Sequence, residues 1–282
     1  MAGRVGTVVT DYALQIEHRT SYRYEHEVRN SKNEVRMTPA RTPWQTIPES
    51  RLDVDPVPSH RVAYLDYFGT AVEGFEVMAP HDHLDVVASA VVHLSREPSD
   101  EFPPPDTERA TEYLPASPMI VWDGGVSSLA AELRRDTAHA SIRAVIDWMR
   151  SSLIYEPGST EVGTPVVDVL EARRGVCQDY AHLCCALLRA LAIPARYVSG
   201  YFAPRPLEPG ESVEAESHAW VEALLPGRAW LPIDPTNDVE PAERHVKVGH
   251  GRDYTDVLPF QGVHAGSPTQ TLEVGVTITR LE

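Results

Sequence analysis

The chain has 282 residues, of which 42% are hydrophobic and 23% charged, and its 41 acidic and 25 basic residues give a net charge of −16. A field of that sign repels nucleic acid and anionic lipid, so we expect neither as a partner. No apolar run reaches the length that spans a bilayer, and residues 1–10 are a poor signal peptide, so we expect a soluble, cytoplasmic protein without membrane association. Three cysteines, two of them adjacent, cannot form a disulfide framework.

The first part of the chain has the patterns of β-strands. Apolar and polar residues alternate over residues 12–24, as in a half-buried strand. Residues 62–77 predict a hairpin with its turn at 66–70, and the β-branched, apolar run 84–94 predicts a buried strand. We therefore expect residues 1–110 to form a β-rich N-terminal region.

A change of composition follows this region. Six prolines fall within residues 98–118, together with several acidic residues. Because proline lacks a backbone N–H and fixes φ, we expect this segment to form neither strands nor helices. It is the best linker, and the best domain boundary, in the sequence.

Helical spacing begins after the linker. Ser127 or Ser128 is expected to cap a helix that starts at Leu129. Apolar residues over 142–149 form one stripe, which predicts a second amphipathic helix.

Two more helices are predicted before the next strands. Thr164-Pro165 is expected to begin a short helix that Gly175 ends, with the proline at its first helical position. A longer helix is expected over residues 177–191, stopped by Pro194.

The rest of the chain alternates as strands do. Three strands are predicted, at 195–201, 219–224 and 230–233. We expect residues 119–262 to form the second domain and the tail, 263–282, to return as a strand to the first domain, because alternation reappears at Leu272.

Cys177 lies where a glycine turn enters a helix, in the segment Gly175-Val176-Cys177. The free N–H groups and the dipole of a helix start stabilise a thiolate, and the same N–H groups can hold an oxyanion. Cys177 is thus a candidate nucleophile, the alternative being a small residue packed under the helix. Cys184 and Cys185 lie in the apolar run of the same helix, so we expect both to be core residues.

A cysteine nucleophile needs a base and a group that orients the base. His218 lies at the entry to one predicted strand and Asp234 at the end of the next, and a turn near Pro226-Gly227 would pair those ends within one residue of each other. The alternatives are a half-buried strand histidine and an Asp-Pro turn. For each residue taken alone the alternative is favoured. Packing does not easily explain why Cys177, His218 and Asp234 would all converge.

Four ordered segments resemble the transglutaminase-like core of bacterial transglutaminase-like cysteine enzymes; they are residues 175–183, 191–201, 217–222 and 234–237. Tyr22-Arg23-Tyr24, Asn33-Glu34 and Asp66-Tyr67-Phe68-Gly69 resemble the β-rich N-terminal region found with this core, although Thr70 stands where the family often has asparagine. The segment 251–257 is similar to a stretch that follows the core in close relatives. The resemblance spans nearly the whole chain.

The resemblance implies a papain-like triad in which Cys177 is the nucleophile, His218 the general base and acid, and Asp234 the group that orients His218. It implies an α+β fold in which a transglutaminase-like core, with the nucleophile's helix packed on an antiparallel sheet, carries the N-terminal β-rich domain. We expect acyl transfer on a peptide or protein substrate through a thioester, with the Cys177 N–H and one unidentified donor holding the oxyanion. Water as acceptor makes a protease or amidase, and an amine makes a transglutaminase. A peptide-binding module without activity is the alternative function.

No cofactor or metal is expected. His81-Asp82-His83 reads as a solvated turn without a third ligand, and no acidic cluster has calcium-loop spacing. A metal hydrolase using histidines is therefore a weak third function. His182 is expected to serve in helix packing or in support of the site, and Tyr201 and Trp220 to line an acyl pocket or to pack in the core.

Overall fold

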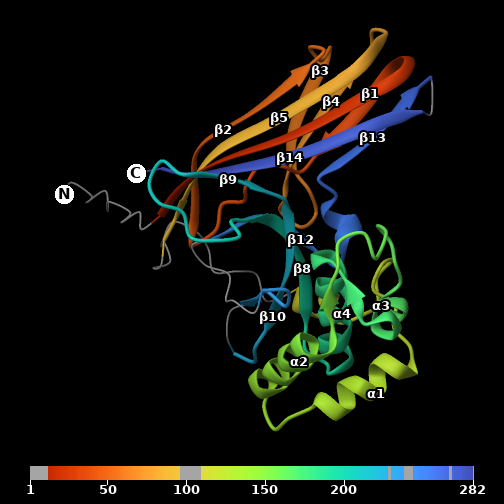
Figure 1. Ribbon diagram of the computed structural model, residues 1–282, viewed down its shortest axis with the longest axis vertical. Helices are drawn as coiled ribbons and strands as arrows, with labels where there is room; N and C mark the ends of the chain where they lie inside the picture. Colours follow the sequence, from red (N-terminus) through yellow and green to blue (C-terminus); the bar gives the residue numbers. More distant parts are fainter. Residues whose placement is uncertain (1–11, 96–108, 228–229, 238–243, 267–268, 282) are drawn as a thin grey trace, which may run out of the picture.

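The computed structural model describes residues 12–95, 109–227, 230–237, 244–266 and 269–281. A large, curled antiparallel sheet lies at one end of the molecule, and helices around a smaller sheet lie at the other (Figure 1). This arrangement confirms the predicted α+β class with a β-rich N-terminal part.

The large sheet is built on β1, a single strand of 24 residues. β1 pairs with β5 and β14 over its first half and with β4 and β13 over its second half. β2 lies beyond β5, β3 beyond β4 and β9 beyond β14. The strands of this sheet are β1 Tyr12–Val35, β2 Gln45–Asp55, β3 His60–Leu65, β4 Ala71–Val77, β5 His81–Leu94, β9 Ser212–Ala215, β13 Phe260–Ala265 and β14 Gln270–Arg280.

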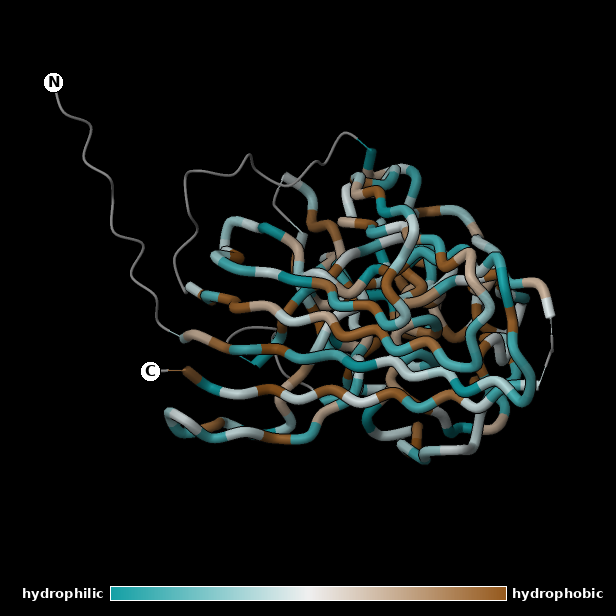
Figure 2. The backbone as a smooth tube through the Cα atoms, turned by 90° about the horizontal axis from the view of Figure 1, so that it is seen from above, coloured by the Kyte–Doolittle hydropathy of each residue, from teal (hydrophilic) through white to brown (hydrophobic). Residues whose placement is uncertain are grey.

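Alternating burial gives this sheet an apolar inner face. In β5 every second side chain from Leu84 to Leu94 is buried, and the tube in Figure 2 shows the same alternation of hydrophobic and hydrophilic residues along neighbouring strands. Leu14 and Ile16 of β1 pack in one buried cluster with Tyr201 and Val246 of the smaller sheet. A continuous hydrophobic core therefore joins the two sheets.

The predicted hairpin is present as β3 and β4. Oδ1 of Asp66 accepts hydrogen bonds from the N–H groups of Phe68 (3.0 Å) and Thr70 (2.9 Å), which closes the turn. Gly69 has φ +81°, a value that glycine adopts without strain. The turn residues thus account for the register of the pair.

The second half of the chain contributes the helices. They are η1 Ala110–Tyr113, α1 Gly124–Leu133, α2 Ala138–Ser152, α3 Val166–Ala172, α4 Cys177–Ala190 and η2 Tyr254–Val257. The predicted stripe of α2 is buried, and α4 is buried on almost all of its surface because α1, α2, α3 and the smaller sheet surround it. This makes α4 the central element of the helical half.

Three predicted helix ends were wrong. The cap of α1 is Asp123, whose carboxylate accepts from two N–H groups of the first turn, and neither Ser127 nor Ser128 caps it. Pro165 is the N-cap of α3 and not its first helical residue, and α3 ends at Ala172 because Arg173 adopts a left-handed conformation with φ 56°.

The proline-rich linker falls largely outside the described residues, at 96–108. From Arg109 onward the expectation of no regular structure is wrong, because η1 forms between the prolines and they do not interrupt it. Tyr113 of η1 is buried and meets the ring of Trp230 edge-on, with centroids 5.3 Å apart. The end of the linker therefore packs against the helical half.

The smaller sheet has the strand order β11-β10-β8-β12, and all of its pairs are antiparallel. Its strands are β8 Ala195–Phe202, β10 Ser217–Leu224, β11 Trp230–Ile233 and β12 His245–Gly251, and a separate short pair consists of β6 Ile154–Tyr155 and β7 Arg174–Gly175. The three strands predicted between 195 and 233 are thereby confirmed.

Two connections tie this sheet to the large one. β9, which immediately precedes β10, pairs with β14, and β14 pairs with β1 over eleven residues. Tyr201 of β8 donates a hydrogen bond to the carbonyl of Met37 (2.9 Å), so it packs between the sheets as a core residue. Whether residues 1–110, 119–262 and 263–282 are separate folding units stays a prediction. Among the described residues, no helix is both long and apolar enough to cross a bilayer.

Candidate active site

Cys177 is the first residue of α4, as the glycine turn before it predicts. Oδ2 of Asp179, in the first turn, accepts the N–H of Val176 at 2.8 Å and the hydroxyl of Thr160 at 2.6 Å. Gly175 is packed so closely that a Cβ there would lie 2.7 Å from Oδ2 of Asp179. These contacts fix the start of α4, and with it the position of the thiol.

His218 and Asp234 come together through the β10–β11 pair. Val221 lies opposite Ile233, so Asp234 follows at the end of β11 beside the start of β10. Nε2 of His218 and Oδ2 of Asp234 are 2.8 Å apart. The hairpin arithmetic from sequence is thus correct within about a residue.

Cys177 completes the group. Its thiol lies near enough to the His218 side chain to help raise the pKa of that imidazole. Because Nε2 of His218 faces Asp234, Nδ1 is the ring nitrogen left for the thiol. The structure therefore brings together all three residues predicted from sequence.

The charges of the site follow from its contacts. Burial alone would lower the pKa of His218, but hydrogen bonds to Asp234 and Cys177 outweigh burial and raise that pKa to about 9. Burial would raise the pKa of Asp234, yet its hydrogen bonds to histidines hold that pKa well below its usual value. At neutral pH the site therefore contains an imidazolium beside a carboxylate.

Two groups on Asp234 were not predicted. Nε2 of His245, on β12, lies 2.9 Å from Oδ2 of Asp234, and the side-chain amide of Asn237 donates to the same oxygen at 2.9 Å. Asn237 follows Asp234 by three residues in a turn, so its closeness to Asp234 could have been predicted from the sequence. His245 was not, because β12 pairs with β8 on the side away from β10, and no local pattern reveals that register.

Aromatic rings support the two histidines. The ring of Phe202 on β8 lies 5.0 Å from that of His218 and 4.5 Å from that of His245, measured between centroids. Trp220 is buried, with its ring 6.1 Å from His218 and 5.3 Å from His245. Trp220 is therefore a packing residue of the site.

Three tyrosines lie near enough to the thiol to be affected by its charge. Burial and then the nearby charge of Cys177 raise the pKa of Tyr155, to about 12, and those of Tyr197 and Tyr254. Tyr155 is 46% exposed, whereas Tyr197 is buried. The thiol therefore lies near three tyrosines, of which Tyr155 is the most exposed.

Other predicted residues have structural roles. Cys184 and Cys185 are fully buried, as expected, and burial raises the pKa of both thiols. His182 is buried and accepts the N–H of Tyr254 at 3.2 Å, which ties α4 to η2. His81 belongs to β5 and is buried, so the expectation of a solvated turn at 81–83 was wrong.

Within the described ranges, two side-chain groups are of the kinds that bind metals. In His218, Asp234 and His245 the ligand atoms lie within 4.8 Å of one another, but both Nε2 atoms hydrogen-bond Oδ2, so they face that oxygen and not a shared central point. Asp55, His83 and Asp85 form the other group, in which His83 contacts Asp82 and Asp55 while Asp85 pairs with Arg23. Both groups are accounted for by hydrogen bonds and ion pairs.

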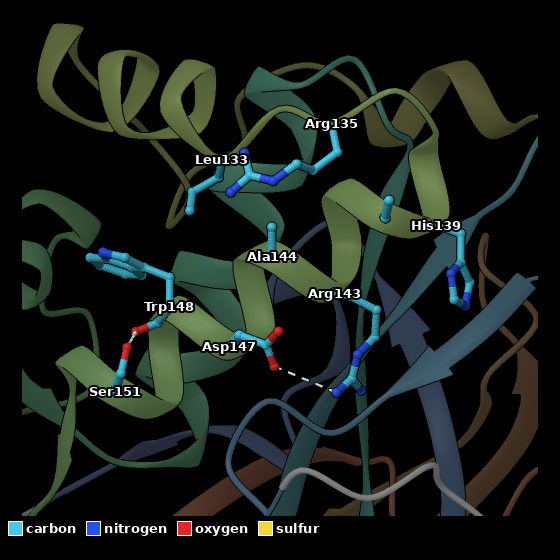
Figure 3. A pocket seen from close by; sticks show the side chains of 9 residues that line it. Leu133, Arg135, His139, Arg143, Ala144, Asp147, Trp148 and Ser151 are labelled. Atoms are coloured by element: carbon cyan, nitrogen blue, oxygen red, sulfur yellow. Dashed lines mark hydrogen bonds and ion pairs between the residues drawn. The ribbon is translucent and has the colours of Figure 1, made fainter.

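A shallow depression on α1 and α2 lies apart from this site (Figure 3). Its lining includes Leu133, His139, Trp148 and the exposed pair Arg143–Asp147, whose charged atoms are 3.5 Å apart. None of the triad residues lines it.

Comparison with known proteins agrees with the geometry. Two family descriptions match: "Transglutaminase-like superfamily" over residues 127–235 and "Bacterial transglutaminase-like N-terminal region" over residues 14–93. A protein of Mycobacterium leprae without an assigned function is 39% identical over 287 residues, which cover 96% of this chain and 99% of that protein. A protein-glutamine gamma-glutamyltransferase of Pseudomonas aeruginosa is 35% identical over 124 residues, or 40% of this chain and 18% of that protein.

A solved structure described as that of a candidate cysteine protease from Cytophaga hutchinsonii has the same fold. It superposes with a TM-score of 0.71 at 22% identity and covers 96% of this chain and 91% of that one. Together with the two family matches, this likeness confirms the predicted fold. The chain belongs to the transglutaminase-like superfamily and carries the bacterial transglutaminase-like N-terminal region.

Proposed function

We propose that this protein transfers acyl groups from a peptide or protein amide through a thioester on Cys177. The observation that carries the proposal is the 2.8 Å contact between His218 and Asp234, with Cys177 at the start of α4 near enough to help raise the pKa of His218. A thiol next to an imidazole that a carboxylate orients is the arrangement used in nucleophilic catalysis by cysteine. Membership in the superfamily supports the same chemistry.

The reaction has two halves. The Cys177 thiolate attacks the carbonyl carbon of the amide, and the N–H of Cys177 faces the oxyanion that forms. The C–N bond then breaks as the His218 imidazolium gives its proton to the departing amine, which leaves an acyl thioester on the sulfur. In the second half His218, now neutral, takes a proton from the acceptor, the acceptor oxygen or nitrogen attacks the thioester carbonyl, and the thiolate leaves.

Asp234 has a positioning role in both halves. Its carboxylate accepts Nε2–H of His218 and so leaves Nδ1 as the nitrogen that exchanges protons with the thiol and the leaving amine. It also stabilises the imidazolium while His218 is charged.

The acceptor determines the kind of enzyme. With water the net reaction is hydrolysis of an amide, and with a primary amine it is exchange of one amide for another. Incubation of the protein with a peptide library, with and without a primary amine, followed by mass spectrometry, distinguishes hydrolysed from amine-bearing products.

Trapping the acyl group on Cys177 tests the proposal. We expect an acyl adduct on the peptide that contains Cys177, and loss of adduct and turnover in Cys177→Ala. The fully buried Cys184 and Cys185 serve as controls in the same sample and should stay unmodified. Turnover by Cys177→Ala would overturn the proposal. Alkylation of Cys177 no faster than a free thiol, together with no adduct, would favour a peptide-binding module instead.

A further inference from the structure

His245 is a buried histidine that the proposed reaction does not use. It lies at the start of β12, 5% exposed, with its Nε2 on the same oxygen of Asp234 that His218 contacts. Two imidazoles on one carboxylate oxygen are more than orientation of His218 alone requires. The contact between His245 and Asp234 therefore needs an explanation beyond the orientation of His218.

The hydrogen bonds of Asp234 indicate that role. Oδ1 accepts the backbone N–H groups of Thr236 (2.9 Å) and Asn237 (3.1 Å), so the turn holds one oxygen. Oδ2, the oxygen that serves His218, is held by side chains alone, namely those of His245 and Asn237. Because χ2 of an aspartate is a soft torsion, the hydrogen bonds to Oδ1 and these two side chains act together to keep Oδ2 in line with His218.

The two histidines differ in charge. Burial lowers the pKa of His245, although its hydrogen bond to Asp234 opposes the change, whereas the pKa of His218 is raised. The titratable and charged groups facing His245 are Asp234, His218 and the neighbouring Arg244, and the β8 and β10 side chains against it, Phe202 and Trp220, are uncharged. His245 is thus neutral when His218 is charged, and a neutral imidazole that contacts a carboxylate through Nε2 carries its proton there.

We propose that His245 is a positioning residue whose neutral imidazole donates from Nε2 to Oδ2 of Asp234 and holds that oxygen in line with His218. The proposal rests on the proposed function, because this alignment matters through the His218–Cys177 pair. Phe202 and Trp220 fix the plane of the His245 ring and so direct its N–H.

Alkylation of Cys177 by two reagents measures the alignment without a substrate. Iodoacetate is an anion that the His218 imidazolium attracts, and iodoacetamide is neutral, so the ratio of their rates falls as His218 loses its proton. In wild-type protein we expect the midpoint of this fall near pH 9. His245→Phe keeps an aromatic ring but removes the donor, and we expect its midpoint to fall by about one pH unit and its iodoacetate rate to drop about tenfold.

His245→Gln is the conservative variant, because its amide can donate from nearly the position of Nε2. We expect it to return the midpoint to within about half a pH unit, and the iodoacetate rate to within about threefold, of the wild-type values. A His245→Phe profile that matches wild type, or that moves to higher pH, would overturn the proposal, and so would a His245→Gln protein as impaired as His245→Phe. Thermal unfolding and circular dichroism establish that both variants fold.

A measurement on wild-type protein covers the case in which His245→Phe does not fold. Long-range ¹H–¹⁵N correlation spectra of protein labelled at histidine nitrogens, with His245→Gln for assignment, should show His245 with its proton on Nε2 and uncharged while His218 titrates. A proton on Nδ1, or a charged His245, contradicts the proposal. Failure of the proposed function is distinguishable, because Cys177 of wild-type protein would then alkylate no faster than a free thiol and form no acyl adduct.

Discussion

The carboxylate of Asp179 and the hydroxyl of Thr160 form a 2.6 Å hydrogen bond beside the first turn of α4. Asp179 is 2% exposed, so this contact and the one to the Val176 N–H satisfy it inside the protein. A negative charge there favours helix formation but opposes a thiolate two residues away. The contacts therefore serve to place Cys177 and not to activate it.

Gly175→Ala tests this placement. The new Cβ would lie 2.7 Å from Oδ2 and 2.8 Å from Cβ of Asp179, so the carboxylate has to move away from Val176. We expect a loss of about 1–3 kcal/mol in the free energy of unfolding, measured with urea, and slower alkylation of Cys177. Gly124→Ala is the matched control, because nothing lies within 4 Å of its Cβ and it should leave both quantities nearly unchanged. Equal behaviour of the two variants would mean that Asp179 does not place the thiol.

The pH dependence of the site follows from His218. Its pKa is raised from 6.5 to about 9, so the charged pair is complete below pH 6.5 and is lost as the pH rises through about 9. We expect the rate of alkylation by iodoacetate, relative to iodoacetamide, to fall with a midpoint near that value. The stability that His218 contributes to the fold should be lost over the same range.

Asp234→Asn removes the charge that holds this proton. Burial lowers the pKa of His218, and without the Asp234 charge less opposes that effect, so the midpoint of the alkylation profile should move downward by at least about one pH unit. The rate of acyl transfer should fall by about 10²–10⁴ because the imidazole is no longer fixed in one tautomer. A midpoint that stays near 9 in this variant would show that Asp234 is not what raises the pKa.

Much of this site was predictable because it depends on local rules. The turn before Cys177 and the close β10–β11 pair place three side chains through short stretches of chain, and hairpin pairing is nearly determined by the turn. His245 reaches Asp234 only through the sheet order β11-β10-β8-β12, which joins strands far apart in sequence. That order is set by packing over the whole core, which periodicity does not record.

Helix ends also divide into those that a local pattern predicts and those that it does not. The predicted apolar stripe of α2 is correct because burial imposes it. The predicted start of α1 is several residues late because Asp123 caps the helix upstream of both serines, and Asp and Ser are about equally good caps, so residue type alone does not decide between them. The structure of η1 was missed because the linker was read from its prolines alone, without the packing of Tyr113 on Trp230.

Arg189 is expected to be important for stability. It is 4% exposed, and its guanidinium donates to the carbonyls of Ala195 (3.0 and 2.9 Å), Pro115 (3.2 Å) and Arg252. Arg189→Met leaves these acceptors without a donor, so we expect a loss of about 3 kcal/mol or more in urea unfolding. Arg143→Met, on the exposed face of α2, is the control and should change stability by about 0.5 kcal/mol or less. Similar losses in the two variants would contradict the role of Arg189.

Metal removal should leave the reaction intact. Because the hydrogen bonds of His218 and His245 to Asp234 already use their facing nitrogens, we expect dialysis against EDTA to leave acyl-adduct formation unchanged. Elemental analysis of the purified protein checks the starting state. A loss of activity that zinc or calcium restores would assign a metal to the protein after all.

The return of β14 to β1 also sets an order of events during synthesis. β14 is translated after the entire helical half, yet the edge of β1 from Leu14 to Tyr24 and the short strand β9 both depend on it for pairing. β9 ends at Ala215, three residues before His218, so the chain segment that leads into the histidine gains its anchor late. A growing polypeptide therefore contains Cys177, His218 and Asp234 before the strand that anchors the segment leading into His218 has been made.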